Sequence, residues 1–230
     1  VNIDVPAFIR LIKQGKILEA AWKIKEQNAL PAVCGRVCPQ EIQCEGLCIV
    51  GKRGEPVAIG NLERFVADWE RESGTGALPP KAEPTGRKIA VVGSGPAGLT
   101  VAYYLRLKGY RITLFEALDR PGGMLRVGIP DYRLPPKILD REIDCILRLG
   151  VDVRTGMRLG TDFTLDDLKS EGYAAVFLGI GAWKDYTLRA EGEDLNGCYT
   201  GIDFLTRFAT WQQSGGRTES VPIGKKCAVI

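Results

Sequence analysis

Two groups of residues in this chain have types and spacings that could do chemistry. The first is a glycine loop, in which Gly93, Gly95 and Gly98 directly follow an apolar, β-branched stretch at residues 88–92. The second is a set of four cysteines within fifteen residues: Cys34, Cys38, Cys44 and Cys48. Glycines at this spacing suit a dinucleotide pyrophosphate, and clustered thiols suit a metal or an iron–sulfur cluster.

The glycine loop has the context that a dinucleotide fingerprint needs. A strand precedes it, a helix over 97–108 is expected after it, and a second strand at 111–116 ends in Glu116. In this pattern the first glycine allows a tight turn, the second lets the backbone approach the pyrophosphate, and the third brings helix and strand together. Glu116 then suits the adenosine ribose. The alternative is a glycine turn that binds nothing.

The cysteine spacing, C-x3-C-x5-C-x3-C, leaves three alternatives open. Zinc usually takes tighter C-x2-C pairs, spaced thiolates in a loop rich in glycine and proline also suit iron–sulfur clusters, and the thiols could be purely structural. Disulfides are not expected for four thiols so close together in a cytosolic protein. The neighbouring flavin-type motif favours the iron–sulfur interpretation. Cys145, Cys198 and Cys227 are expected to be small buried hydrophobes.

Composition narrows the classes of function. The 230 residues are 45% hydrophobic and 26% charged, with a net charge of +3, which is typical of a globular protein. No basic run suggests nucleic acid, and no apolar run or leader suggests a membrane, so we expect a cytoplasmic protein. Because the chain has no histidine, a bound cofactor is expected to carry the chemistry.

Periodicity and turn signals place the elements that must position these residues. Apolar residues at helical spacing predict two short helices within 5–28 and another over 59–72, with a loop over 31–56 between them. Residues 73–86 are rich in Pro and Gly and are expected to be a linker. Beyond it, strand and helix alternate, which predicts an open, mostly parallel sheet. The predicted segments are 88–92, 97–108, 111–116, 136–149, 151–154, 165–170 and 174–178, followed by a helix over 201–212 and a strand at Lys226.

Residues 224–230 repeat the pattern of residues 86–92, the first strand of the fingerprint, and stop where a glycine loop should begin. We interpret this as the start of a second nucleotide domain in a longer polypeptide, although an ordinary strand would also fit. The fold expected is α/β and truncated at both ends. An N-terminal α-helical iron–sulfur-type domain (1–72) and the linker precede a Rossmann-like FAD-binding domain (87–223), and 224–230 begin an NAD(P)H-binding domain.

Three segments together resemble a known family of oxidoreductases. Residues 33–40 (VCGRVCPQ), 44–48 (CEGLC) and 59–65 (IGNLERF), followed by the Gly-Ser-Gly-Pro-Ala-Gly loop, resemble the NADPH-dependent glutamate synthase small subunits. The flavin subunit of NADH-dependent ferredoxin:NADP oxidoreductase and the N-terminal part of dihydropyrimidine dehydrogenase share the pattern. The resemblance implies a helical domain with two 4Fe-4S clusters, and an FAD domain interrupted by an NAD(P)H domain.

The resemblance also implies a set of cluster ligands. Cys38, Cys44 and Cys48 match ligands, Glu63 matches an unusual non-cysteine ligand, and Cys34 matches a position that often is not a ligand. The family's further ligands come from a cysteine-rich segment that would precede Val1 and is not in this sequence. We therefore expect this chain alone to bind iron substoichiometrically.

The FAD site carries over motif by motif. Residues 121–125 resemble a second glycine pair beside the ribityl phosphate, residues 126–134 a segment near the flavin ring, and Val153 a residue that flanks adenine. Residues 178–183 resemble a strand end that returns to the FAD, although a plain turn would also explain Gly179 and Gly181. The expected FAD-binding residues are Gly93, Ser94, Gly95, Pro96, Ala97, Gly98, Glu116, Ala117, Gly122, Gly123, Leu125, Ile129, Arg133, Val153, Gly179, Gly181, Ala182 and Trp183.

These features predict an electron-transfer subunit that passes electrons from NAD(P)H through FAD to 4Fe-4S clusters and a partner. The partner would be a glutamate synthase large subunit in the first interpretation and a ferredoxin-type protein in the second. We expect no catalytic side chain, and the fragment alone is expected to be inactive. The competing hypothesis is a zinc-stabilised nucleotide-binding scaffold without turnover.

Overall fold

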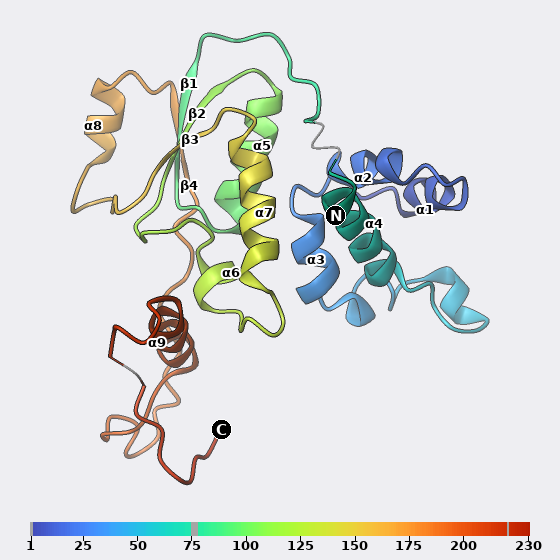
Figure 1. Cartoon of the computed structure of the whole chain (residues 1–230). Helices are drawn as coiled ribbons and strands as arrows, with labels where there is room; N and C mark the ends of the chain where they lie inside the picture. The colour runs from blue at the N-terminus through green and yellow to red at the C-terminus, as the bar shows by residue number, and fades with distance from the viewer. Residues whose placement is uncertain (1, 75–77, 220) are drawn as a thin grey trace.

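The computed structural model describes residues 2–74, 78–219 and 221–230. Its N-terminal part is helical (Figure 1). The elements are α1 (Val5–Lys13), α2 (Ile17–Lys25), α3 (Pro31–Val37), the 3-10 turns η1 (Gln40–Ile42) and η2 (Ile49–Lys52), and α4 (Ile59–Ser73). The Asp4 carboxylate accepts a hydrogen bond from the Ala7 amide at 3.1 Å, so it caps α1. The helices predicted within 5–28 and 59–72 are therefore confirmed.

A four-stranded parallel sheet forms the second part. Its strands are β1 (Lys88–Val92), β2 (Arg111–Phe115), β3 (Asp152–Arg154) and β4 (Ala175–Leu178), in the order β3-β2-β1-β4. Val92 pairs with both Phe115 and Leu178, so the carboxyl ends of three strands are level with one another. This order creates a crevice at those ends, which is where open parallel sheets bind ligands.

Helices cover both faces of the sheet, as the alternation of strands and helices predicted. They are α5 (Pro96–Leu107), the short α6 (Met124–Val127), α7 (Pro136–Leu147) and α8 (Leu165–Ser170). In Figure 1, α5 and α7 lie between the sheet and the N-terminal helices, and α8 covers the opposite face. Buried Leu99 and Leu139 pack on one side with Val91 and Leu114, and Leu168 packs on the other with Phe115.

The N-terminal helices share a core with the sheet part. Ala32 and Val33 of α3 belong to the same buried cluster as Leu139 and Ile143 of α7. A second cluster, around Phe8 and Ile24 and their neighbours, lies inside the N-terminal helices alone. The two parts are thus joined through apolar packing as well as by the chain itself.

The segment predicted as a single loop over 31–56 contains helix α3, so that prediction was wrong for 31–37. Leu30 occupies the N-cap position of this helix, but its apolar side chain makes no capping hydrogen bond. Pro31 occupies the first turn. The local signals for a helix are therefore weak, and the remaining support comes from α7, as described below. Short helix α6 was also not predicted.

Residues 78–86 of the predicted linker lie along the sheet part, and residues 75–77 are outside the described residues. The Ala82 amide donates to the Leu107 carbonyl oxygen at 2.8 Å, and the Thr85 amide donates to Gly109 at 3.1 Å. These bonds hold residues 78–86 to the turn that follows α5, without regular secondary structure.

The C-terminal part contains α9 (Gly201–Gln213), as predicted, but the strand expected at Lys226 is absent from the described residues. Residues 224–230 are exposed and make no strand pairing there. A strand requires a neighbouring strand to bond its backbone groups, and nothing in the described part provides one.

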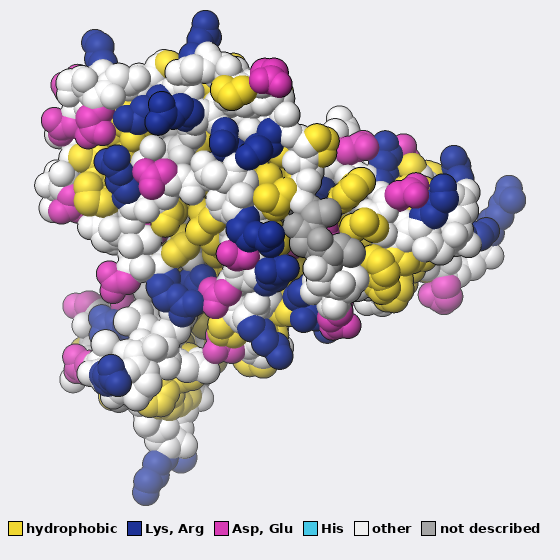
Figure 2. Space-filling view, turned by 45° about the horizontal axis from the view of Figure 1, so that its top comes forward, with side chains coloured by type: hydrophobic (Ala, Val, Ile, Leu, Met, Phe, Trp, Pro, Cys, Tyr) yellow, Lys and Arg dark blue, Asp and Glu magenta, His cyan; other side chains and the backbone are white. Residues whose placement is uncertain are grey.

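On the face shown in Figure 2, Lys and Arg side chains are interspersed with Asp and Glu.

Candidate functional site: a glycine-lined groove and a cysteine loop

A groove of about 900 Å³ opens at the carboxyl ends of β1, β2 and β4. Its walls are the glycine loop after β1, the end of β2, the segment after β3 and the end of β4. The lining residues are Val92, Gly93, Ser94, Gly95, Pro96, Ala97, Phe115, Glu116, Ala117, Leu118, Gly123, Met124, Met157, Arg158, Leu159, Leu178, Gly179, Ile180, Gly181, Trp183 and Lys184. A groove of this volume is in the range of cofactor sites.

The three glycines of the loop have three different physical roles. Gly93 has a φ of +99°, and a Cβ there would collide with the carbonyl oxygen of Gly179. A Cβ on Gly98 would collide with the carbonyl oxygen of Gly93, so α5 can approach β1 only because Gly98 has no side chain. Gly95 has open space where a Cβ would lie, and it faces the groove. The first and third glycines therefore build the loop, and the second leaves room for a ligand.

Ser94 joins three loops at the base of the groove. It is fully buried, and both its amide (2.9 Å) and its hydroxyl donate to Glu116 Oε2. The Ser94 hydroxyl also accepts a hydrogen bond from the Gly122 amide at 3.0 Å. The glycine loop, the end of β2 and the second glycine pair are thus fixed to one another through one side chain.

Donors from the protein fill most of the acceptor positions on the Glu116 carboxylate. It is 4% exposed, and its Oε1 accepts the Leu118 amide at 2.8 Å in addition to the two bonds from Ser94 at Oε2. A carboxylate offers about four acceptor positions, so three are filled and one remains on Oε1. The residue expected to hold a ribose therefore has capacity for a single further hydroxyl.

The structure brings eleven of the expected FAD-binding residues to the groove and leaves the others outside its lining. Those in the lining are Gly93, Ser94, Gly95, Pro96, Ala97, Glu116, Ala117, Gly123, Gly179, Gly181 and Trp183. Gly98 and Gly122 act behind the wall, as described above. Leu125 is buried, Ile129 and Val153 pack against the main core, and Arg133 and Ala182 are exposed.

Sequence reasoning missed the segment that follows β3. Met157, Arg158 and Leu159 line the groove, whereas Val153, inside the strand, packs against the core. The Met157 amide donates to the Glu116 carbonyl oxygen at 2.8 Å, which holds this segment beside the end of β2. Gly156 and Gly160, which flank the segment, were the available signal, because a turn after a parallel strand reaches the ligand edge.

Of the four clustered cysteines, Cys34 lies within α3 and Cys38 directly follows that helix, whereas Cys44 and Cys48 lie in the turn segment between η1 and η2. All four are free and half-buried. In the described part of the chain, no three Cys, Asp or Glu side chains are grouped so that they could hold one metal ion. The Cys34 thiol donates to Asn28 Oδ1 at 3.6 Å, and the Asn28 amide donates to Glu63 Oε1 at 2.7 Å. Cys34 and Glu63 are therefore engaged with Asn28.

The surroundings of the four thiols shift their pKa values in different directions. Burial, together with the Glu63 charge, raises the pKa of Cys34 to about 11, and burial raises the pKa of Glu63 to about 7. Backbone hydrogen bonds, first that of Val57, lower the pKa of Cys48. Since the thiolate is the form that binds metal, Cys48 is the better prepared donor and Cys34 the poorer one. Cys38 and Cys44 each have a pKa raised mainly by burial.

Two family models match the chain. Residues 1–75 match dihydropyrimidine dehydrogenase domain II, 4Fe-4S cluster, and residues 91–140 match the NAD(P)-binding Rossmann-like domain. The first covers the helices and the cysteine loop, and the second covers the glycine loop, Glu116 and the second glycine pair. In the described residues, no helix has both the length and the apolar character needed to span a membrane.

Curated relatives match nearly the whole chain. The NADP(+)-dependent formate dehydrogenase subunit beta of Moorella thermoacetica is 40% identical over 227 residues, which cover 89% of this chain and 32% of the relative. The glutamate synthase [NADPH] small chain of Escherichia coli is 35% identical over 230 residues, covering 98% of this chain and 48% of the relative. The NAD-dependent dihydropyrimidine dehydrogenase subunit PreT of Escherichia coli is 40% identical over 205 residues, covering 89% and 48%. The chain spans about a third to a half of the length of these relatives.

Proposed function

We propose that this chain belongs with the NAD(P)-dependent flavoprotein oxidoreductase subunits to which it is similar, such as the glutamate synthase small chains, and that it is the part of an electron-transfer subunit that holds FAD and an iron–sulfur cluster. Electrons from NAD(P)H would pass through FAD to 4Fe-4S clusters, and from there to a partner subunit. The glycine-lined groove at the strand ends is the observation that carries this proposal.

The groove offers hydrogen-bonding groups that suit the pyrophosphate and the ribose of an FAD molecule. The first-turn amides of α5 have no acceptors within the helix and lie beside Gly95, where space remains for a pyrophosphate. Glu116 has one acceptor position left for a ribose hydroxyl. When bound, the flavin supplies the exchange between hydride and single-electron chemistry. The residues of this chain bind and orient it, and no side-chain base is required.

The cysteine loop offers Cys38, Cys44 and Cys48 as thiolate donors, since Cys34 is bonded to Asn28. Three thiolates are fewer than the four that a 4Fe-4S cluster normally takes, so a further segment, or Glu63 once released from its hydrogen bond with Asn28, would complete the set. The proposed partner is an electron-accepting subunit of the glutamate synthase large-subunit type. The relatives that support this are themselves named as small or beta subunits.

Binding of FAD tests the proposal. We expect the purified chain to be yellow, with absorbance near ~450 nm from a flavin that is released as FAD on denaturation. Gly95→Leu should lower FAD affinity at least about 100-fold, because Gly95 has an ordinary φ of −66° and its side chain would fill the groove. Gly201→Leu is the matched control, since a Cβ there also meets open space but lies outside the groove.

Equal FAD affinity in Gly95→Leu and in the parent protein would contradict the assignment of the groove. A colourless protein that holds stoichiometric zinc would favour the scaffold hypothesis instead. Iron content after anaerobic reconstitution tests the cysteine loop: Cys44→Ser should lower it, whereas Cys198→Ser, at an exposed thiol outside the loop, should leave it unchanged.

A further inference from the structure

The junction between the helical part and the sheet part contains a buried carboxylate that the proposed FAD site does not use. Glu142 of α7 is 8% exposed, and its Oε2 accepts a hydrogen bond of 3.1 Å from the Ala32 amide, which belongs to helix α3. The Val33 amide also donates a hydrogen bond to this carboxylate. Glu142 therefore supplies acceptors to the first turn of a helix that lies 110 residues away in the sequence.

Helix α3 has no cap of its own. Its N-cap residue, Leu30, makes no side-chain hydrogen bond to the first turn, and Pro31 has no amide hydrogen to offer. The next amides, those of Ala32 and Val33, would be left unpaired inside a buried interface without Glu142, and unpaired buried amides are costly. The start of this helix is thus stabilised by the other part of the molecule.

The same helix positions two of the four clustered cysteines. Cys34 lies on α3, and Cys38 directly follows the helix as its C-cap residue. Apolar contacts between α3 and α7 allow the two helices to pack, but such contacts are not directional. The bonds from Ala32 and Val33 to Glu142 fix the axial position of α3 along α7, and with it the position of both cysteines.

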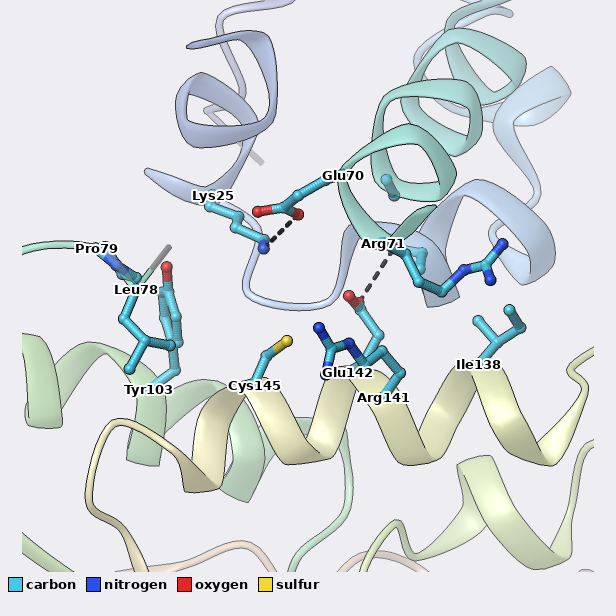
Figure 3. A pocket seen from close by; sticks show the side chains of 12 residues that line it. Lys25, Glu70, Arg71, Leu78, Pro79, Tyr103, Ile138, Arg141, Glu142 and Cys145 are labelled. Atoms are coloured by element: carbon cyan, nitrogen blue, oxygen red, sulfur yellow. Dashed lines mark hydrogen bonds and ion pairs between the residues drawn. The ribbon is translucent and has the colours of Figure 1, made fainter. Parts of the chain in front are cut away.

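Figure 3 shows the surroundings of Glu142 at this junction. Lys25 of α2 and Glu70 of α4 form an ion pair of 2.6 Å, with both side chains mostly buried, and the Tyr104 hydroxyl of α5 donates to the Lys25 carbonyl oxygen at 3.2 Å. The cavity that Lys25, Glu70 and Glu142 help to line is about 40 Å³, far too small for a cofactor. This is a packed junction and not a second ligand site.

We propose that Glu142 is a positioning residue that fixes the cysteine-bearing helix α3 on the flavin-type domain. Its relevance to electron transfer rests on the proposed function, because only then do α3 and the groove hold the two redox groups. The positioning itself rests on the hydrogen bonds and burial alone. The charged and titratable groups around Glu142 are Lys25 of α2, Cys34 of α3, Glu70 and Arg71 of α4, Tyr103 of α5, and Arg141 and Cys145 of α7.

Protonation gives the junction a measurable signature. Burial raises the pKa of Glu142 to about 7, with Lys25 and the Ala32 amide acting in the opposite direction. When α3 separates from α7, this carboxyl returns to water and to a lower pKa. Docking therefore takes up a proton, and it should weaken as the pH rises from about 4.5 towards 7.

Amide hydrogen exchange of the complete chain tests the proposal without any cofactor. In Glu142→Ala, exchange at Ala32 and Val33 should become at least about 30-fold faster relative to amides of β1, and Glu142→Gln, which keeps an acceptor oxygen, should restore most of the protection. Between pH 5 and pH 8, after correction for intrinsic rates, exchange at these two amides should accelerate roughly 100-fold in the parent and stay flat in Glu142→Gln. Asp144→Asn, an exposed position on the same helix, is the control.

A second readout links the junction to electron transfer. In protein loaded with FAD and iron, electron passage from reduced flavin to the cluster should slow in Glu142→Ala and recover in Glu142→Gln. Unchanged exchange at Ala32 and Val33 in Glu142→Ala, or a uniform increase along the whole chain, would overturn the proposal. If Glu142→Ala does not fold, the pH dependence of Glu142→Gln decides alone. A parent protein that binds no FAD would contradict the proposed function and leave the exchange result intact.

Discussion

The glycine groove and the cysteine loop differ in how their geometry is maintained. In the groove, backbone contacts and buried hydrogen bonds fix every wall: Gly98 lies against Gly93, and Ser94 binds both Glu116 and Gly122. In the cysteine loop, one thiol lies on a short helix and three lie in the turns that follow it, and no three metal-binding side chains in the described residues are grouped as ligands of one ion. The groove is held in place by contacts among its own wall segments, whereas the helix at the start of the cysteine loop depends on a hydrogen bond to Glu142 of α7.

The largest expected effect is at the third glycine of the groove. Gly98→Val places a Cβ against the Gly93 carbonyl oxygen, which is backbone and cannot move aside without separating α5 from β1. We expect a loss of at least about 3 kcal/mol in the free energy of unfolding, measured by chemical denaturation. Gly201→Ala, which meets no atom within 4 Å, serves as the control. A Gly98→Val protein of normal stability would show that the glycine loop and α5 can move apart at little cost, and that backbone contacts do not hold the groove rigid.

The second prediction concerns pH and the junction that supports the cysteine loop. The pKa of Glu142 is raised to about 7 in the folded chain, so between about pH 4.5 and 7 the folded state binds more protons than the unfolded state. Stability should therefore fall as the pH rises through this window, by about 3 kcal/mol at most for one such group. Glu63, whose pKa is also raised to about 7, contributes in the same direction.

Thermal or urea unfolding of Glu142→Gln across this window tests that prediction. The slope of stability against pH should become shallower, with the remainder due to Glu63 and other groups. Asp167→Asn is a useful contrast at lower pH: hydrogen bonds from Thr164 lower the pKa of Asp167 from its usual value near 3.8, so its contribution to stability is constant in this window and is lost as the pH falls below about 4. An identical slope in Glu142→Gln and the parent would mean that the junction does not titrate.

The third prediction removes the hydroxyl that joins the groove loops. Ser94→Ala leaves the buried Gly122 amide without its acceptor and removes one of the two donors to Glu116 Oε2, since the Ser94 amide remains, so we expect a loss of about 2 kcal/mol. FAD affinity should fall as well, because the two glycine loops are no longer held together. Ser170→Ala, at an exposed helix end, should cost much less. Equal losses in the two variants would argue against a role for Ser94 in organising the groove.

The smallest expected effect is in the cysteine loop. A Cβ on Gly60 would meet the Gln40 side chain, whose amide donates to the Cys34 carbonyl oxygen at 2.8 Å. Because a flexible side chain can move, Gly60→Ala should cost only about 1 kcal/mol. Gln40→Ala should relieve most of this cost in the double variant, and a double-mutant cycle measures the coupling. Additive effects would show that the two residues are independent.

The sequence allowed the fold class, the parallel sheet and most elements to be predicted, because periodicity and turn residues act locally. Helix α8 occurs at Leu165–Ser170 as predicted, where Thr164 and Asp167 form a capping box. Helix α3 was missed, since its first-turn amides are bonded by Glu142, and no local pattern reveals a partner so distant in the sequence. The strand predicted at Lys226 was wrong because a repeated pattern supplies a strand's residues but not its neighbour.

The glycine loop could be recognised from sequence alone, because the positive φ of Gly93 and the collision that a Cβ on Gly98 would make with Gly93 are properties of the local backbone path. Only the tertiary structure decided which other residues reach the groove: the segment at Met157 does, whereas Val153 packs in the core. It also decided that Glu116 has protein donors on both oxygens and that the cysteine-bearing helix is capped by Glu142 of the sheet part. Local sterics are encoded by neighbouring residues, whereas burial and hydrogen-bond partners depend on segments that meet only when the chain folds.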